Sequence, residues 1–163
     1  MLKWLWIVPI VLVLLTVIAL VAGQAGLLRG RAPADLGLRD GRFKPPSKSP
    51  NSVSSQADLW PNQPQAAKAQ IAPLALVGDG AATLARIEAI VRATPGAEIV
   101  NRDGDYIYAT FTTRWMRYTD DVEFSFDPAR AVVQVRSASR LGKSDLGANR
   151  ARIEALRAQL TAR

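Results

Sequence analysis

The sequence contains neither cysteine nor histidine. The chain therefore has no thiolate nucleophile, no imidazole base and none of the usual zinc-ligand sets. A serine hydrolase would need a lysine or a carboxylate as base, and the two lysines beyond residue 50, Lys68 and Lys143, fall in a predicted linker and a predicted loop. We expect no metal and no cofactor, and an enzyme is the less favoured class of function.

Charged side chains are also absent from Trp4 to Leu28, a run that Lys3 and Arg29 flank. As a helix, the apolar stretch from Trp4 to Val21 is about 27 Å long, close to the roughly 30 Å hydrocarbon core of a bilayer. We interpret residues 1–28 as a transmembrane anchor that contacts the membrane through residues 4–28. The alternative is a cleaved signal peptide, because small residues follow the run, although the apolar core of a signal peptide is usually shorter.

Two arguments about orientation oppose each other. The positive-inside rule compares the positive charges on the two sides of the apolar run, which are Lys3 on one side and Arg29, Arg31 and Arg39 on the other. This comparison slightly favours a cytoplasmic domain. The signal-like layout at the N-terminus favours export instead. We expect a single-pass protein of a bacterial inner membrane, with its folded domain in the periplasm.

Residues 29–73 have the composition of a tether, with seven of the ten prolines, many serines and no periodic apolar pattern. Partial order is expected around residues 45–60, where the run PNSVSS and Trp60 are unlike a spacer. The first half is basic, so it is either a segment that contacts anionic lipid headgroups or a solvated linker. The basic residues are Arg29, Arg31, Arg39, Arg42, Lys44 and Lys48.

The remaining residues, 74–163, hold 13 basic and 11 acidic side chains, and this near balance argues against nucleic-acid binding. Helical spacing of apolar residues predicts a helix over residues 80–94, with Asp79 as its N-cap and Pro95 near its end. A second amphipathic helix is predicted over residues 146–160, with Ser144 or Asp145 as its N-cap.

Four strands are predicted between these helices. The first two, over residues 97–102 and 105–113, are joined by the Asp103-Gly104 turn. The others cover residues 121–126 and 131–138. We predict an α+β domain in the order helix, four strands, helix, in which both helices cover one face of a four-stranded antiparallel sheet.

The other face of this sheet is predicted to be polar and open to water. In the third strand Val122, Phe124 and Phe126 alternate strictly with Asp121, Glu123 and Ser125, a pattern typical of one buried and one solvated face. Four further side chains are expected to share a side of the neighbouring strand and to offer a docking surface. They are Tyr106, Tyr108, Thr110 and Thr112.

The densest group of polar side chains spans the end of the last strand, a loop and the first turn of the final helix. A helix N-terminus presents free N–H groups, so this group predicts an anion site for a phosphate, a carboxylate or a lipid headgroup. The alternative is structural: Asp145 caps the helix, the two arginines of the strand pair with Asp121 and Glu123, and Asn149 fastens the loop. The predicted site residues are Arg136, Ser137, Ser139, Arg140, Ser144, Asp145, Asn149 and Arg150.

Three motifs together carry a family resemblance: VRSASRLGKSDLGANRARIEALRAQL at residues 135–160, DDVEF at 120–124 and SPNSVSS at 49–55. Over roughly residues 41–160 the chain resembles the domain-of-unknown-function family 1499. Members in bacteria and plant chloroplasts carry hydrophobic N-termini, lipoprotein signals or targeting to the thylakoid lumen, so the resemblance implies export. It implies no catalytic residue. Many members have a cysteine pair in the form C-P-x-S-P-N-C, where this chain has Pro46 and Ser52.

We therefore predict a membrane-anchored, non-enzymatic accessory domain that binds a protein partner or an anionic ligand at the membrane surface. One alternative is an enzyme acting on an envelope or lipid substrate through residues 136–150, with Asp121 or Glu123 as general base; this requires an unpaired carboxylate in a pocket. Another alternative is a small permanent subunit of a membrane complex. Its anchor would pack on another helix through Ala19, Ala22, Gly23 and Gly26.

Overall fold

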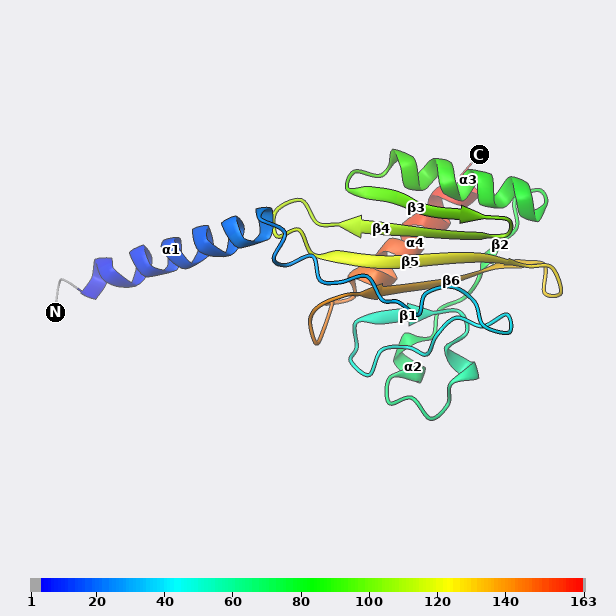
Figure 1. Cartoon of the computed structure of the whole chain (residues 1–163), viewed down its shortest axis with the longest axis horizontal. Coiled ribbons are helices and arrows are strands. Elements are labelled where there is room, and N and C mark those ends of the chain that lie inside the picture. Colours follow the sequence, from blue (N-terminus) through cyan, green and yellow to red (C-terminus); the bar gives the residue numbers. More distant parts are fainter. Residues whose placement is uncertain (1–3, 163) are drawn as a thin grey trace.

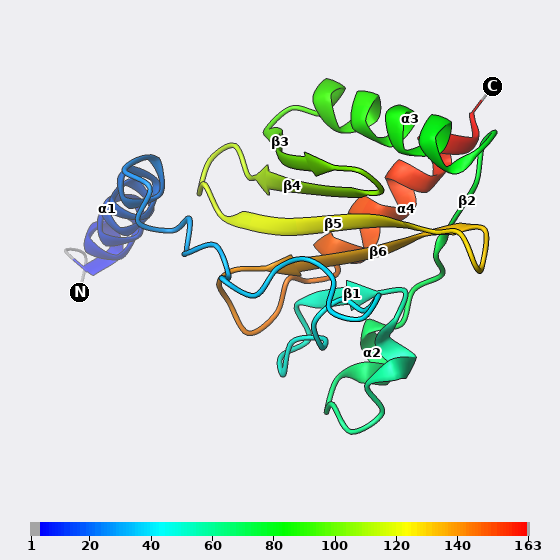
Figure 2. The same cartoon turned by 45° about the vertical axis from the view of Figure 1, so that its right-hand side comes forward.

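The computed structural model describes residues 4–162, so Lys3, expected to flank the apolar run, lies outside the described residues. The chain has an α+β architecture in which an N-terminal apolar helix precedes an antiparallel sheet (Figures 1 and 2). The sheet has six strands rather than the predicted four. In chain order the elements are α1 (Trp4–Gln24), β1 (Ser52–Ser54), the 3-10 turn η1 (Ala57–Leu59), α2 (Ala66–Ala69), β2 (Leu74–Ala75), α3 (Gly80–Ala93), β3 (Ala97–Asp103), β4 (Tyr106–Thr112), β5 (Thr119–Asp127), β6 (Val132–Ser139) and α4 (Ala148–Thr161).

Helix α1 projects away from one end of the sheet (Figure 1). Its residues Trp6–Gln24 have a mean hydropathy of 2.8, and almost all of this stretch is exposed, so the helix is long and apolar enough to cross a membrane. Pro9 lies inside the helix, in its second turn. A helix of this kind is either a membrane anchor or a signal sequence.

The four predicted strands form the meander β3-β4-β5-β6. The predicted turn between β3 and β4 lies one residue further on, at Gly104-Asp105, because Asp103 still pairs with Tyr106. Gly104 adopts the left-handed conformation that this tight turn needs (φ +48°). The strands β5 and β6 pair over eight residues from Asp120 opposite Ser139 to Asp127 opposite Val132. The last strand begins at Val132 rather than at residue 131, because Ala131 belongs to the preceding turn with φ +50°.

One hydrophobic core lies between the sheet and the two long helices. It joins Leu84, Ile87 and Val91 of α3 and Ile153, Leu156 and Leu160 of α4 to Ile107, Ala109, Val122, Phe124, Val133 and Val135 of the strands. Both helices therefore cover the same face, as predicted. The predicted N-cap of α3 is confirmed, since Asp79 accepts a hydrogen bond from the N–H of Ala82. Helix α4 begins at Ala148 rather than at residue 146, because Gly147 still has a left-handed conformation.

The segment predicted to be a tether is packed against the domain over much more than residues 45–60. Phe43 and Pro46 are buried, and so is the whole run from Asn51 to Ala57. Strand β1 pairs with β6 through Ser54 opposite Arg136, and β2 pairs with β6 through Leu74 opposite Val133. These two short strands account for the difference between four and six, and neither has the alternating apolar pattern that reveals a strand in a sequence.

The second face of the sheet is covered, which corrects the prediction of a wet, open face. Residues 29–51, called the arm from here on, cross this outer face in front of β5 and β6 (Figure 1). Beneath the arm, Asp121 is 2% exposed, Glu123 is fully buried and Tyr108 is 9% exposed. The alternating carboxylates of β5 therefore face a polar interior and not water.

Candidate functional site

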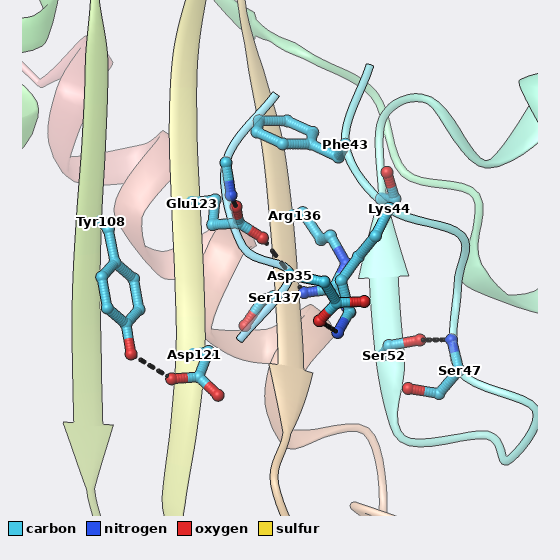
Figure 3. Close-up of polar contacts among 12 residues, drawn as sticks. Asp35, Phe43, Lys44, Ser47, Ser52, Tyr108, Asp121, Glu123, Arg136 and Ser137 are labelled. Atoms are coloured by element: carbon cyan, nitrogen blue, oxygen red, sulfur yellow. Dashed lines mark hydrogen bonds and ion pairs between the residues drawn. The ribbon is translucent and has the colours of Figure 1, made fainter. Parts of the chain in front are cut away.

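The centre of the outer face is a buried ion pair between Glu123 of β5 and Arg136 of β6, which are directly opposite each other in the sheet register. Arg136 Nη1 lies 3.2 Å from Glu123 Oε2, and both side chains are at most 3% exposed. The other carboxylate oxygen accepts hydrogen bonds from the backbone N–H of Gly37 at 2.7 Å and from the hydroxyl of Tyr106 at 2.8 Å. Figure 3 shows Glu123 between the arm and Arg136. This carboxylate thus ties the arm to the middle of the sheet.

A second ion pair lies beside the first. Arg140 donates to both oxygens of Asp121, with Nη2 2.7 Å and Nε 3.0 Å from them. The hydroxyl of Tyr108 donates to Asp121 Oδ1 at 2.5 Å and accepts from Arg140 Nη2 at 3.0 Å. Burial and the hydrogen bond to Asp121 raise the pKa of Tyr108 to about 12. Burial and the neighbouring Glu123 carboxylate likewise raise the pKa of Tyr106 far above its ordinary value.

The arm forms the outer wall of this site. Gln56 fastens it, accepting from the N–H of Phe43 at 2.8 Å and donating to the carbonyl of Gly41 at 3.0 Å. Lys44 pairs with Asp35 at 2.5 Å, and its hydrogen bond keeps the pKa of Asp35 below the usual value. Arg39, Arg42, Phe43 and Trp60 help to line a cavity of about 400 Å³ along the arm. Charges of both signs lie around this cavity, so it is not a clear anion pocket.

A separate polar cluster lies on the inner face, where β6 meets α4. The buried side chain of Asn149 accepts from the hydroxyl of Ser137, and its amide nitrogen lies within hydrogen-bond distance of Ser139 Oγ, Asp145 Oδ2 and the carbonyl of Asn51. Asp145 accepts from the N–H groups of Gly147 and Asn149. Burial raises the pKa of Asp145, but these hydrogen bonds outweigh it and hold the pKa below its usual value. Asn149 therefore joins the start of β1, the end of β6 and the first turn of α4.

The eight predicted site residues do not converge on one point, because alternate residues of a strand point to opposite faces. The structure brings Ser137, Ser139, Asp145 and Asn149 together on the inner face. It places the other four elsewhere: Arg136 and Arg140 on the outer face, Arg150 on the carbonyls of Lys68 and Gln70, and Ser144 on an exposed turn. Asp121 and Glu123, required as free carboxylates by the enzyme alternative, are both paired with arginine.

Sequence reasoning missed several residues of these clusters. Tyr106 and Tyr108 were predicted to share the outer face, and the register of β4 against β5 would have placed Tyr108 opposite Glu123. Asp120 and Arg152 form a third buried ion pair, at 2.5 Å, beside Ser137. No signal in the sequence indicated Gly37, since it contributes only a backbone N–H.

Among residues 4–162, no group of three aspartates or glutamates lies close enough together to hold a metal ion. Arg136 Nε is buried without a hydrogen-bond partner among the described residues, while its Nη1 is paired. The ion pairs neutralise the buried charges of the outer face, and the contact between Gly37 and Glu123 fixes the arm. The guanidinium groups are occupied by carboxylates and are not presented to a ligand.

Fold and site together define an α+β domain that follows an apolar helix and locks its own N-terminal arm with buried ion pairs. The chain belongs to the family described as Protein of unknown function (DUF1499), whose family model matches residues 42–160. Helix α1 and Gly37 lie outside the matched region. No curated protein and no solved structure matches the chain. Where the resemblance implies a cysteine pair, Pro46 is buried and the hydroxyl of Ser52 accepts from the N–H of Ser47 at 2.9 Å (Figure 3).

Proposed function

We propose that this chain is a single-pass, membrane-anchored, non-enzymatic accessory domain of the bacterial inner membrane. Its folded part lies on the periplasmic side and binds a protein partner or an anionic ligand at the membrane surface. The observation that carries this proposal is the contact between the end of α1 and the loop after β4. Gln24 donates to the carbonyls of Arg114 and Trp115, at 3.2 and 2.8 Å.

Close packing supports the same contact. A Cβ atom on Gly23 would lie 2.7 Å from the carbonyl oxygen of Met116, so only glycine permits this approach. In the permanent-subunit alternative Gly23 would pack on a second helix, whereas here it contacts Met116 of its own domain. A domain fixed to the end of a spanning helix is held against the bilayer surface, where it meets membrane-bound partners and lipid headgroups. Positioning of this kind needs no catalytic group.

The enzyme alternative loses its support at the same time. It needs a carboxylate free to accept a proton, and both candidates are buried against arginines. A permanent subunit of a membrane complex differs from the proposed role only in the lifetime of its contacts.

The test has two stages. First, membranes that contain the full chain are washed with alkaline carbonate and the intact mass of the retained protein is measured. The proposal expects the uncut chain in the pellet; the uncut chain in the supernatant would contradict anchoring, and a mass lacking the first residues would identify a cleaved signal peptide.

Second, the chain is purified in mild detergent and its protein and lipid companions are identified by mass spectrometry. Gly23→Leu, which forces α1 off the loop, should lose a companion that the wild type retains. Ala25→Leu, which introduces the same side chain at an exposed position two residues away, is the matched control and should retain it. A wild-type chain that always emerges alone would contradict the proposed role.

A further inference from the structure

Two loops at the end of the sheet nearest α1 present apolar side chains to the outside. They are residues 113–118, between β4 and β5, and residues 140–147, between β6 and α4; both lie at this end in Figures 1 and 2. Leu146 is 97% exposed and Trp115 is 63% exposed. Tyr118 and Leu141 are each about two-fifths exposed. Soluble domains rarely cluster large apolar side chains in this way without a partner for them.

The two loops hold these side chains outward in a fixed conformation. Leu146 has φ +52° and Arg117 has φ +58°, a left-handed region where glycine or asparagine is the usual residue. Asp145 and Ser144 secure the turn around Leu146 by accepting from the N–H groups of Gly147 and Leu146. The other loop is closed by the N–H of Thr113, which donates to the carbonyl of Tyr118. Exposing a leucine in a left-handed turn is unfavourable in free energy, and a binding role for this side chain explains why the turn has it.

Positive charges outnumber negative ones at this end. Besides Arg140, which pairs with Asp121, five cations lie in or next to the loops, and none of these five forms an ion pair with any residue in the described part of the chain. The two loops contain one acidic residue, Asp145, whose carboxylate accepts from backbone N–H groups. Arg114 lies over the ring of Trp115, at 5.0 Å from its centroid. The opposite end of the sheet carries Asp103 and Asp105 in its β3–β4 turn. The five cations are Arg29, Arg31, Arg114, Arg117 and Lys143.

The surface is continuous with α1. Met116 and the carbonyls of Arg114 and Trp115 contact the end of this helix, as described above. Leu28, which follows α1, lines a groove of about 460 Å³ together with Tyr118, Leu141 and Leu146. Aromatic and aliphatic side chains next to unpaired arginines, beside the end of an apolar helix, are the composition of a membrane interface.

We propose that these two loops form a membrane footprint, which docks on an anionic bilayer surface and inserts Trp115 and Leu146 at the level of the lipid headgroups. This inference rests on the proposed function, because it requires α1 to be embedded in the same bilayer. In this inference, the anionic ligand of the proposed function is the lipid headgroups of the membrane itself. It also gives the outward-facing arginines and the exposed leucine one common role.

The absence of cysteine allows a direct test with the full chain. Single cysteines at Trp115→Cys and Leu146→Cys, and at Asp105→Cys as a far-end control, are labelled with an environment-sensitive fluorophore. The purified proteins are reconstituted in nanodiscs of phosphatidylcholine alone or with phosphatidylglycerol. The footprint predicts a blue-shifted emission at positions 115 and 146 in anionic nanodiscs and a water-like emission at 105. The shift should weaken in high salt.

Charge reversal in the loop between β4 and β5 is the second part of the test. Each cation near an anionic surface is worth roughly fivefold in the ratio of docked to undocked domain. Arg114→Glu with Arg117→Glu should therefore lower this ratio by roughly thirtyfold or more and abolish the blue shift. Arg86→Glu with Arg130→Glu changes the net charge equally at a distance from the loops and should leave the shift in place.

Three results would overturn the footprint while the chain remains in the carbonate-washed pellet. The first is a water-like emission at 115 and 146 in anionic nanodiscs. The second is a shift equally strong in uncharged nanodiscs and insensitive to the loop charges. The third is a probe that is water-exposed in nanodiscs and shielded only in native membranes, which would identify a protein partner. Release of the chain by carbonate would instead contradict the proposed function.

Discussion

Replacement of Glu123 by glutamine tests how strongly the buried pair stabilises the domain. Glutamine keeps the shape of the side chain and one acceptor for Gly37 or Tyr106, so the main loss is the partner of the Arg136 guanidinium. That group is 3% exposed and cannot regain its hydration. Removal of one partner from a buried pair costs about 3–5 kcal/mol, a large part of the roughly 5–15 kcal/mol that stabilises a domain.

The assay is urea unfolding of the full chain in mild detergent, followed by circular dichroism. Glu154→Gln is the matched control, because Glu154 pairs with Arg157 at 2.9 Å but is half exposed, and its loss should cost less than about 1 kcal/mol. Glu123→Leu combined with Arg136→Met should recover part of the stability, since no unpaired charge is left in the interior. If Glu123→Gln and Glu154→Gln were equally stable, the stabilising role assigned to the buried pair would be refuted.

Four further predictions concern single positions. Gly96→Ala should cost about 1–3 kcal/mol in the same assay, because Gly96 has φ +79° and a Cβ there would lie 2.4 Å from the carbonyl oxygen of Thr112; an unchanged urea midpoint would contradict this. Asn149→Ala should cost roughly 1–3 kcal/mol and expose the β6–α4 junction to hydrogen exchange, since it leaves buried polar groups unsatisfied. The raised pKa of Tyr108 contributes stability that is present below about pH 10 and lost as the pH rises towards about 12, so the alkaline decline should be smaller in Tyr108→Phe. The lowered pKa of Asp145 contributes stability that is present above roughly pH 4 and lost as the pH falls through its folded value, which an acid unfolding series of Asp145→Asn should show as a smaller decline.

The meander and its two helices could be predicted because local signals agree with the tertiary structure there. Asp79 caps α3, the Asp-Gly signal locates the hairpin turn to within one residue, and the apolar residues of β5 have a strict period of two. Each of these signals depends on residues within a few positions of one another. Boundaries were less accurate, since Ala131 and Gly147 adopt left-handed conformations that composition alone does not indicate.

The covered outer face could not be predicted, because carboxylates at alternate positions have the same pattern whether they face water or buried arginines. The information that decides between these states is the partner strand and the arm. The Ser52–Ser54 strand is three residues long and polar, and it forms only because β6 offers a free edge. The tie between Gly37 and Glu123 spans 86 positions and involves a backbone N–H that any residue but proline would supply.

The sequence left two interpretations of Arg136 and Arg140 open, an anion site or ion pairs within the sheet. The arginines were expected to pair with Asp121 and Glu123, and they do, in the combinations Arg140 with Asp121 and Arg136 with Glu123. The exposed apolar loops at the α1 end were not predicted, since Trp115 lies in a turn without periodicity and Leu146 was assigned to the predicted helix over residues 146–160, whereas it is 97% exposed in the turn before that helix. Their significance depends on the position of α1, which only the structure supplies.

The packed arm also limits how far this domain travels. Forty-five residues of flexible chain would have a root-mean-square span of about 37 Å, enough to let a domain search a wide shell around its attachment point. Here the hydrogen bond from Gly37 to the centre of the sheet and the seating of Phe43 remove that freedom almost at the start of the segment. The folded domain is therefore held within about its own height of the end of α1, and a flexible tether of the same length would not hold it there.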